Sequence, residues 1–391
     1  MKTRISTANL LQLLVLFLPT RTVQCPSVTR APAPENIAPQ RIDVHHHFVP
    51  DFYAQALRAN GGDPSGWSIP DWSLEKDLSF NDEQRISFAF LTITAPGAEI
   101  LPLVEQAGFC RQANQAAAEI RAAQPARYGF FATIPSLLDP EAAHTEIIHA
   151  LDELQADGII LYTRFGSDNH YLGHPDFRST WDLLNKRRAT VFVHPTHPVD
   201  THWVNPSLPQ PMIDYPHETT RTAVDLIISG IMREFTDVKI ILSHAGGTLP
   251  YLALRPAAVL PYLPPSIAPP VVAAAAAQEG HHATDVTNQF MEDAKRFYFD
   301  TALSTGSHTL SLLKEFAKPD HVLYGSDFPY APSPAIADMN ARLDRYGAEN
   351  DEAFVQSVAS EAALKLFPRL SNVLSKNYYV WVATTNIVSR C

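Results

Sequence analysis

The feature that most constrains this sequence is a regular alternation of short, apolar, β-branched runs with helical patterns along most of its length. Such alternation is typical of parallel strands joined by crossover helices. Eight units favour a closed barrel over an open sheet, so we predict an α/β fold of the (β/α)8, or TIM-barrel, type. The predicted strands cover Arg41–Val44, Ser87–Ile93, Tyr128–Ile134, Gly158–Tyr162, Thr190–Val193, Lys239–Ser243, Arg296–Asp300 and His321–Tyr324.

The barrel is predicted to span residues 41–370, and a signal-like segment precedes it. Lys2 and Arg4 are followed by an apolar run from Leu10 to Leu18, a pattern typical of a secretory signal, which we assign to residues 1–25. The run is too short to span a bilayer, so no membrane span is expected. The pattern predicts a protein of the secretory pathway or extracellular space, with the cytosol as the alternative.

Three other segments stand apart from the strand and helix rhythm. Residues 26–40 carry four prolines and are predicted to form a linker. Residues 261–280 are rich first in proline and then in alanine, which predicts an insertion after the sixth strand. Residues 371–391 are a C-terminal extension to which the sequence assigns no role.

Charge and cysteine content narrow the classes of partner and site. The chain has 30 basic and 41 acidic side chains, and the resulting net charge of −11 argues against a nucleic-acid partner. Its three cysteines, Cys25, Cys110 and Cys391, form neither a disulfide framework nor a CxxC zinc site. Sixteen histidines are present. A bound metal would therefore take histidine and carboxylate ligands.

Histidines and one aspartate follow four of the predicted strands. The first strand leads into His45 and His47, which share one face because side chains alternate along an extended chain. The fifth leads into His194, the sixth into His244 and the eighth into Asp327. Each residue alone could be a packed structural group. Because the carboxyl ends of barrel strands meet at one mouth, the ordered set predicts a catalytic site with a divalent metal.

Four segments carry a resemblance to a known family. The segments are Arg41-Ile-Asp-Val-His-His-His-Phe-Val-Pro50, Phe192-Val-His-Pro195, Ile241-Leu-Ser-His-Ala-Gly-Gly247 and Tyr324-Gly-Ser-Asp-Phe-Pro329. With them the sequence resembles the amidohydrolase superfamily, in its aminocarboxymuconate-semialdehyde decarboxylase branch, from about residue 41 to residue 369.

The resemblance implies a ligand set and a proton-handling residue. It assigns His45, His47, His194 and Asp327 to one divalent metal, with His244 beside it as general acid/base and Asp327 sharing the proton. Binuclear members use a lysine at the end of strand four, and this sequence has none there. Three imidazoles and a carboxylate suit Zn²⁺, and Mn²⁺ is the alternative.

The implied reaction is the non-oxidative decarboxylation of a small hydroxy-aromatic acid. Its expected substrate is 6-methylsalicylate, which would give m-cresol and CO2 in fungal polyketide secondary metabolism, such as mycotoxin formation. One alternative is a metal-dependent hydrolase that opens a lactone or an amide on the same site. Another is a metal-binding protein without catalysis. The branch also implies a homodimer.

Substrate-contacting residues are harder to predict. Arg255 is a candidate carboxylate clamp because arginine offers a bidentate fork, and a solvated surface arginine is the alternative. Three aromatic residues are candidate walls for a ring, with packing as their alternative. They are Phe48, Trp67 and Phe328. Loop or capping residues that could instead reach the site are His197, His217 and Glu218.

Overall fold

The computed structural model describes residues 40–276 and 282–374. The predicted signal-like segment 1–25 lies outside the described residues, and so does the predicted linker apart from residue 40. Part of the predicted insertion, residues 277–281, and the C-terminal extension from residue 375 onward also lie outside them.

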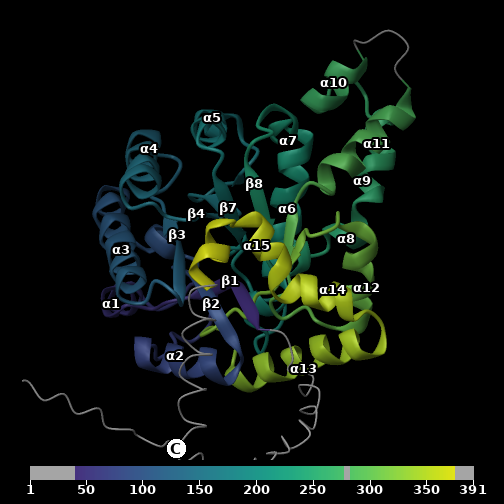
Figure 1. The fold of residues 1–391 in the computed structure, drawn as a ribbon. Helices are drawn as coiled ribbons and strands as arrows, with labels where there is room; N and C mark the ends of the chain where they lie inside the picture. The colour runs from purple at the N-terminus through teal and green to yellow at the C-terminus, as the bar shows by residue number, and fades with distance from the viewer. Residues whose placement is uncertain (1–39, 277–281, 375–391) are drawn as a thin grey trace, which may run out of the picture. The chain divides into compact units, whose positions relative to one another are not determined.

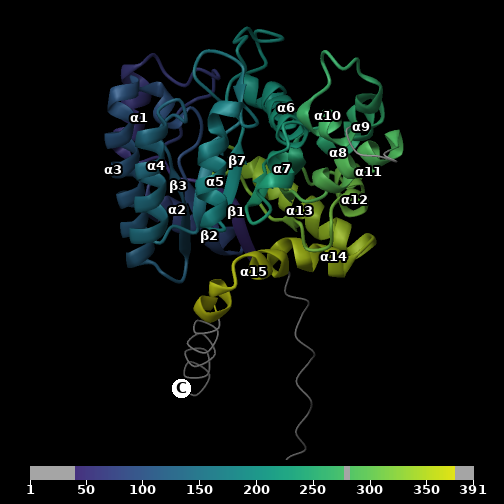
Figure 2. The ribbon, with the colours of Figure 1, turned by 90° about the horizontal axis from the view of Figure 1, so that it is seen from above.

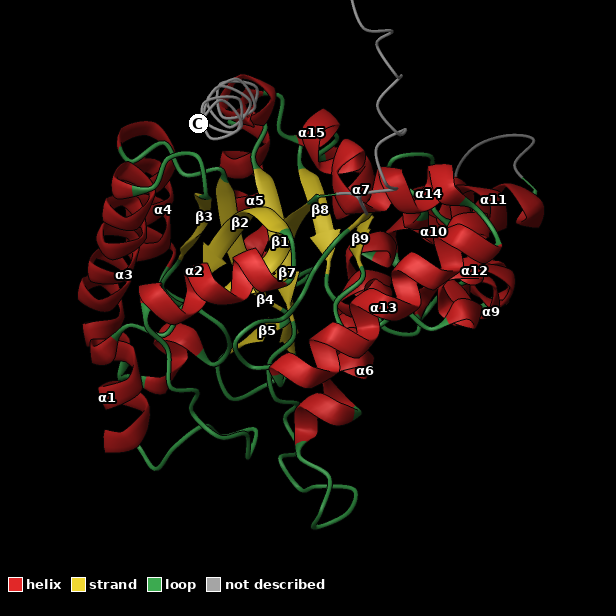
Figure 3. Cartoon of the chain, turned by 60° about the horizontal axis from the view of Figure 1, so that its bottom comes forward, coloured by secondary structure: helices red, strands yellow, loops and turns green. Residues whose placement is uncertain are grey.

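Eight parallel strands form one sheet and follow one another in chain order. Figure 3 shows these strands inside and the helices around them. The first and last strands are joined by backbone hydrogen bonds from Val44 N to the Tyr324 carbonyl (3.0 Å) and from His47 N to the Phe328 carbonyl (2.7 Å). The predicted (β/α)8 barrel is therefore confirmed. The strands are β1 (Arg41–His47), β2 (Ile86–Thr92), β3 (Tyr128–Thr133), β4 (Gly158–Tyr162), β7 (Thr190–His194), β8 (Lys239–Leu242), β9 (Tyr298–Asp300) and β10 (Val322–Leu323).

The helices surround the strands (Figure 1). They are α1 (Asp51–Ala59), α2 (Leu74–Glu83), α3 (Leu103–Ala123), α4 (Pro140–Ile148), α5 (Arg178–Lys186), α6 (Asp214–Ile228), α7 (Ile231–Glu234), α8 (Leu249–Leu252), α9 (Leu254–Val259), α10 (Pro270–Ala276), α11 (Ala283–Ala294), α12 (Ser307–Phe316), α13 (Ser333–Glu349), α14 (Glu352–Gln356) and α15 (Ala362–Leu366). Helices α8–α11 lie between β8 and β9 in the chain, the interval for which the sequence predicts an insertion.

Two local features differ from the sequence prediction. Strand β1 continues through His47, whereas we predicted that it ends at Val44. Pairing with β2 as far as Thr92, and the hydrogen bond from His47 N to β10's loop, keep its polar end extended. An additional antiparallel hairpin, β5 (Arg164–Phe165) with β6 (His170–Tyr171), follows β4.

The strands are buried on both faces, as expected for a parallel sheet covered by helices. Every residue of β4 is buried, and its first residue, Gly158, is required by a close backbone approach. A Cβ at this position would lie 2.3 Å from the Thr190 carbonyl oxygen of β7. Glycine therefore lets β4 and β7 pair at the register that aligns Tyr162 with His194.

A column of aromatic rings fills the barrel from its amino-terminal end toward its mouth. Phe367, which follows α15, lies 4.5 Å from the ring of Phe90, and Phe90 stacks on Phe131 at 4.8 Å. Phe131 then contacts Phe192 at 5.8 Å, and Phe192 lies 4.9 Å from the His45 ring. The C-terminal helices pack against β1 and β10 through the π-helical turn η7 (Ser357–Glu361; Figure 2). This packing closes one end of the barrel and leaves the carboxyl ends of the strands for the site.

Among the described residues, every helix is too short or too polar to cross a membrane.

Candidate metal centre

The four predicted ligands meet at the mouth of the barrel. One ligand atom from each of His45, His47, His194 and Asp327 lies within 4.8 Å of the others. The Nε2 atoms of His45 and His47 are 3.1 Å apart, and they lie 3.3 and 3.2 Å from Asp327 Oδ1. Three imidazoles and one carboxylate thus converge on one point from β1, β7 and the segment after β10.

The two histidines of β1 are oriented by hydrogen bonds at their outer nitrogens. His45 Nδ1 lies 2.7 Å from the buried carboxylate of Asp300 and donates its proton to it. His47 Nδ1 lies 2.6 Å from the hydroxyl of Thr92, which donates its own proton to the His46 carbonyl and so accepts from His47. With a proton on each Nδ1, each neutral ring offers Nε2 as its free lone pair, and both Nε2 atoms face inward.

The histidine that ends β7 and the one that follows β8 obey the same rule with carbonyl acceptors. His194 Nδ1 donates to the Pro195 carbonyl at 2.7 Å, and His244 Nδ1 donates to the Ala302 carbonyl at 3.2 Å. A carbonyl oxygen can only accept, so it fixes the proton on Nδ1 and leaves Nε2 unprotonated in the neutral ring. The four rings around the mouth therefore share one tautomer, and His194 and His244 both line the pocket described below.

Asp327 is held in place by the closure of the barrel. Its backbone N–H donates to the His45 carbonyl at 2.8 Å, and its φ of 64° is in the left-handed region. His244 also has a left-handed φ, of 53°. For residues other than glycine such conformations cost about 1–3 kcal/mol and persist where the surrounding structure enforces them. Both strained residues thus present their side chains to the site.

Charges within the cluster shift its titration. Burial alone would lower the pKa of His45, but the carboxylates of Asp300 and Asp327 outweigh it and raise the pKa to about 10. Burial lowers the pKa of His47 to about 4, against its hydrogen bond to Asp327, and burial with His47 holds the pKa of His194 well below its usual range. Burial would raise the pKa of Asp327, but His45 holds it well below its usual range. Asp327 is therefore an anion at neutral pH.

This donor set fits a divalent metal ion. Its ligand atoms are buried or nearly so, they include one carboxylate, and three aligned Nε2 atoms offer lone pairs in their neutral form. No lysine or arginine lies among the described residues that line the adjoining pocket. The negative charge of Asp327 is thus countered in this structure only by the histidines around it.

The middle histidine of the triplet has a different role. His46 points away from the ligands, as the strand alternation predicts, and its two nitrogens lie 3.0 Å from Asp43 and 2.9 Å from Asp77. Burial would lower the pKa of His46, but these carboxylates raise it to about 10. The Oδ1 of Asp43 also accepts hydrogen bonds from His45 N (3.0 Å) and Ser326 N (3.1 Å). His46 and Asp43 therefore tie β1 to α2 and to the segment that carries Asp327.

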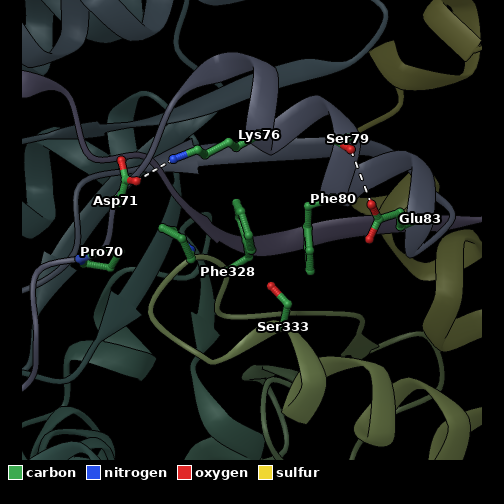
Figure 4. Close-up of a pocket in the computed structure, with 9 residues that line it drawn as sticks. Pro70, Asp71, Lys76, Ser79, Phe80, Glu83, Phe328 and Ser333 are labelled. Atoms are coloured by element: carbon green, nitrogen blue, oxygen red, sulfur yellow. Dashed lines mark hydrogen bonds and ion pairs between the residues drawn. The ribbon is translucent and has the colours of Figure 1, made fainter.

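The segment after Asp327 is anchored on the outside of the barrel by an aromatic stack. Phe328 stacks on Phe80 of α2, with ring centroids 3.9 Å apart (Figure 4). The two rings border a surface cavity of about 500 Å³ that also contacts Lys76, Glu83 and Ser333. Phe328 therefore fixes the loop from behind and does not line the substrate pocket, contrary to its predicted role as a wall.

A second cavity, of about 400 Å³, opens directly onto the metal centre. Its walls are mostly apolar and come from loops at the carboxyl ends of the strands. Asp63 is the charged side chain on this wall apart from Asp327 and the histidines, and burial raises its pKa. The pocket is lined by Asp63, Ser65, Trp67, Thr94, Ala95, His194, Pro211, Met212, Tyr215, Pro216, His244, Leu303, Ser304, Asp327, Tyr330, Ala331, Pro332 and Ala335.

The other predicted substrate contacts have mixed outcomes. Trp67 lines the pocket, and its indole N–H donates to the Tyr330 carbonyl at 3.0 Å. Phe48 is buried and packs against Trp72 instead. Arg255 is exposed on α9 and does not line the pocket, so this chain's own Arg255 supplies no carboxylate clamp there.

The three loop and capping candidates also lie outside the pocket lining. The His197 carbonyl accepts a hydrogen bond from Arg164 Nε at 2.9 Å, so this residue helps to hold its loop. His217 is exposed at the start of α6. Glu218 is buried beside it and accepts a hydrogen bond from the Tyr171 hydroxyl at 2.8 Å. Each of these residues has a structural role or faces solvent.

Sequence reasoning missed the residues that orient the ligands. Asp300 is the last residue of β9, so the rule that selected the other strand ends could have selected it too. Besides His45, its carboxylate accepts the backbone N–H groups of His244 (3.0 Å) and Ala302 (2.9 Å). Thr92 at the end of β2 could have been found in the same way.

Comparison with known proteins gives the family. The sequence model of the amidohydrolase family matches residues 42–369. The chain belongs to the amidohydrolase family. It is 49% identical over 337 residues to the 6-methylsalicylic acid decarboxylase of Penicillium expansum, covering 86% of this chain and 98% of that protein. It is 47% identical over 332 residues to 6-methylsalicylic acid decarboxylase acuB of Aspergillus aculeatus, covering 84% and 96%.

A solved decarboxylase structure has the same fold. The dihydroxybenzoic acid decarboxylase of Polaromonas sp. JS666, solved with manganese and the inhibitor 2-nitroresorcinol, aligns with a TM-score of 0.66 and 22% identity. The alignment covers 85% of this chain and 97% of that one. The resemblance predicted from the strand-end motifs is thereby confirmed at the level of the family and the fold.

Proposed function

We propose that this amidohydrolase is a metal-dependent decarboxylase of a small hydroxy-aromatic acid, with 6-methylsalicylate as its substrate and m-cresol and CO2 as products. The observation that carries the proposal is the junction of two features: a three-histidine, one-aspartate centre opens into an apolar pocket of about 400 Å³, and His244 lines that pocket with Nε2 free. The named substrate of the two fungal relatives supports the choice of acid.

The proposed metal is a single zinc ion held by His45, His47, His194 and Asp327. Three imidazoles and a carboxylate are ligands that zinc commonly takes, and the manganese in the Polaromonas enzyme makes Mn²⁺ the alternative to test. When bound, the ion supplies Lewis acidity and a template for the carboxylate and the adjacent phenol oxygen. The end of β4 carries Tyr162, whose hydroxyl donates to the Ile93 carbonyl at 3.1 Å, so no lysine is available there to bridge a second ion.

His244 is proposed to move the proton. Its Nδ1–H is engaged by Ala302, and burial followed by the charge of His45 lowers its pKa, so the resting ring is neutral with a basic Nε2. We assign Nε2 the task of taking a proton from solvent or from the ortho hydroxyl and giving it to the ring carbon that bears the carboxylate. The carbon–carboxylate bond then breaks, a carbon–hydrogen bond replaces it, and CO2 leaves. Asp327, held as an anion, serves as ligand in this scheme.

The composition of the pocket wall favours a reaction in which the substrate loses its negatively charged carboxylate. Besides the histidines, no positive side chain among the described lining residues pairs with a substrate carboxylate. An apolar wall poorly solvates an anionic group that faces it, whereas CO2 and a neutral phenol carry no such cost. Trp67, Tyr215 and Tyr330 supply aromatic surface for the ring.

The deciding experiment incubates the metal-loaded full chain with 6-methylsalicylate and related hydroxybenzoates and follows release of CO2 and phenol. A His244→Ala variant should keep its metal and lose turnover by about 10²–10⁴-fold, the usual contribution of a general acid/base. His217→Ala is the matched control, because His217 is exposed at the start of α6; this variant should keep both metal and activity.

Two outcomes would reject the proposal. Cleavage of esters or lactones without turnover of any hydroxybenzoate would make the chain a hydrolase. Loss of metal from His244→Ala would make His244 a ligand in place of a proton carrier. Reconstitution of the metal-free chain with zinc and with manganese, followed by metal analysis and rate measurement, tests the choice of ion.

A further inference from the structure

A second group of metal-ligating side chains lies outside the pocket lining, in the segment that follows β4. His170 of β6, His174 and Asp176 each offer one ligand atom, and these atoms lie within 4.8 Å of one another. In the described part of the chain, none of the three residues lines the substrate pocket or belongs to the four-ligand group at the barrel mouth. We propose that these residues form a separate binding site for a divalent transition-metal ion of the zinc class.

The spacing within the group suits shared coordination better than an ordinary ion pair. His174 Nδ1 lies 3.5 Å from Asp176 Oδ2, which is longer than a direct charged hydrogen bond, and it accepts the Asp176 backbone N–H at 3.3 Å, a long bond that an ion on Nδ1 would replace. Two ligands that are each about 2.0–2.2 Å from one tetrahedral ion lie roughly 3.4 Å apart. The rings of His170 and His174 have centroids 4.4 Å apart, and the three ligand atoms lie within 4.8 Å of one another.

An independent observation concerns His170. Its Nδ1 is buried and has no hydrogen-bond partner within the described part of the chain. A buried polar nitrogen without a partner loses its hydration and gains no hydrogen bond in return. The neutral ring carries its proton on one nitrogen and a lone pair on the other, so a cation coordinated by this histidine would offset that loss.

The backbone around the group is already ordered. His174 N donates to the Tyr171 carbonyl at 2.9 Å, and Phe177 N donates to the His174 carbonyl at 3.0 Å. The Phe177 side chain is buried beneath the two imidazoles, with ring centroids 6.4 Å from His170 and 5.9 Å from His174. A site on such a segment needs little further ordering to bind an ion.

The local charge also favours a cation. Asp225 of α6 accepts the Gly173 N–H at 2.7 Å and interacts electrostatically with His174. Together with Asp176 it places two carboxylates near His174. The nearest arginine in sequence, Arg178, directs its guanidinium to Glu234 and to the Ser229 carbonyl instead.

The test counts zinc ions in the full chain. Metal analysis after equilibration with chelator-buffered Zn²⁺ should give two equivalents for the wild type. It should give one equivalent for His170→Gln and for His174→Gln, and each variant should keep the decarboxylase rate of the wild type. His202→Gln, an exposed histidine that also faces an aspartate, is the matched control and should keep two equivalents.

Two independent readouts keep the proposal falsifiable. Saturating Zn²⁺ should raise the unfolding temperature of the wild type more than that of either variant, because an ion bound only to the folded chain stabilises it. A wild type that binds one equivalent throughout the micromolar range, with that equivalent retained by His170→Gln and His174→Gln, overturns the proposal. Two equivalents in folded His174→Gln, checked by circular dichroism, would place the second ion elsewhere and overturn it as well.

Discussion

Replacement of Asp300 by asparagine tests how much a residue that contacts His45, and is not itself a proposed ligand, contributes to metal affinity. Its Oδ2 lies 2.7 Å from His45 Nδ1, and its Oδ1 accepts the backbone N–H groups of His244 at 3.0 Å and Ala302 at 2.9 Å. All three of these contacts bring a donor to the carboxylate. Asparagine has nearly the same shape but offers one acceptor atom and one donor group.

Either orientation of the new amide creates a conflict. If its oxygen stays with the two backbone N–H groups, its NH₂ faces His45 Nδ1, which must give up its proton and carry it on Nε2, the ligand atom. If the amide flips, its NH₂ faces the two backbone N–H groups. The first orientation removes the lone pair of His45 Nε2; the second keeps it, because the amide oxygen still accepts from His45 Nδ1, but it leaves the backbone N–H groups of His244 and Ala302 without their acceptor.

The expected magnitude follows from this geometry. Loss of a partner that orients a metal-bound histidine weakens metal affinity by about 10–100-fold, which is ~1.4–2.7 kcal/mol. Because both atoms of the His45–Asp300 contact are fully buried, water cannot replace the carboxylate, and we expect the upper half of this range. The change should appear in the dissociation constant for metal before it appears in turnover at saturating metal.

The assay is competition of the metal-free Asp300→Asn chain against a chelator of known affinity, followed by metal analysis. Asp293→Asn is the matched control, because Asp293 is also a buried carboxylate, on α11, where it pairs with Arg233 at 2.7 Å. Circular dichroism and the unfolding midpoint report whether each variant is folded. A folded Asp300→Asn chain whose metal affinity stays within about threefold of the wild type would refute the orienting role.

Three further predictions follow from the pKa of His46, the Phe80 stack and the charge of Asp63. The pKa of His46 is about 10 in the folded chain and 6.5 in the unfolded chain, so the stabilisation by its protonated form is complete below pH 6.5 and is lost as the pH rises through 10. The difference in free energy of unfolding between wild type and His46→Gln, measured in urea, should therefore shrink from pH 6.5 to pH 10. A difference that stays constant with pH would contradict this prediction. Phe80→Ala should lower the free energy of unfolding by about 3–5 kcal/mol in the same urea assay, because it removes a buried ring stacked on Phe328, and a loss below about 1 kcal/mol would count against this packing. Asp63→Asn should lower the KM of an anionic substrate about fourfold at low salt, as expected for the removal of a like charge about 10 Å away at an effective dielectric of about 40. The difference in KM between variant and wild type should disappear below the raised pKa of Asp63, where the wild-type side chain is neutral as well. An unchanged KM would argue that this carboxylate does not face the substrate.

Much of the barrel could be predicted from local sequence. The eight predicted strands coincide with observed strands because a parallel strand buried on both faces needs a continuous apolar run, and these runs are visible without any tertiary information. The predicted ends of strands were less accurate where pairing with neighbouring strands keeps polar residues in an extended conformation. The polar residues His45–His47 remain in β1 because β2 and the segment after β10 pair with them.

The convergence of these side chains at the barrel mouth could also be predicted, because the rule behind it is topological. Carboxyl ends of consecutive barrel strands meet at one mouth, so histidines at three strand ends and an aspartate at a fourth had to converge. The same rule does not say which nitrogen of a histidine faces inward. That depends on acceptors far away in the chain, such as Asp300, which lies 255 residues from His45.

The sequence by itself therefore determined the barrel, its chain order and the residue types that meet at its mouth, because each follows from the local alternation of side chains. Only the tertiary structure decided that the histidines share one tautomer, that Phe328 anchors a loop from outside and that Arg255 stays away from the pocket. These properties depend on contacts between residues distant in the chain, and hydrogen bonding and packing across such distances leave no periodic signal in the sequence.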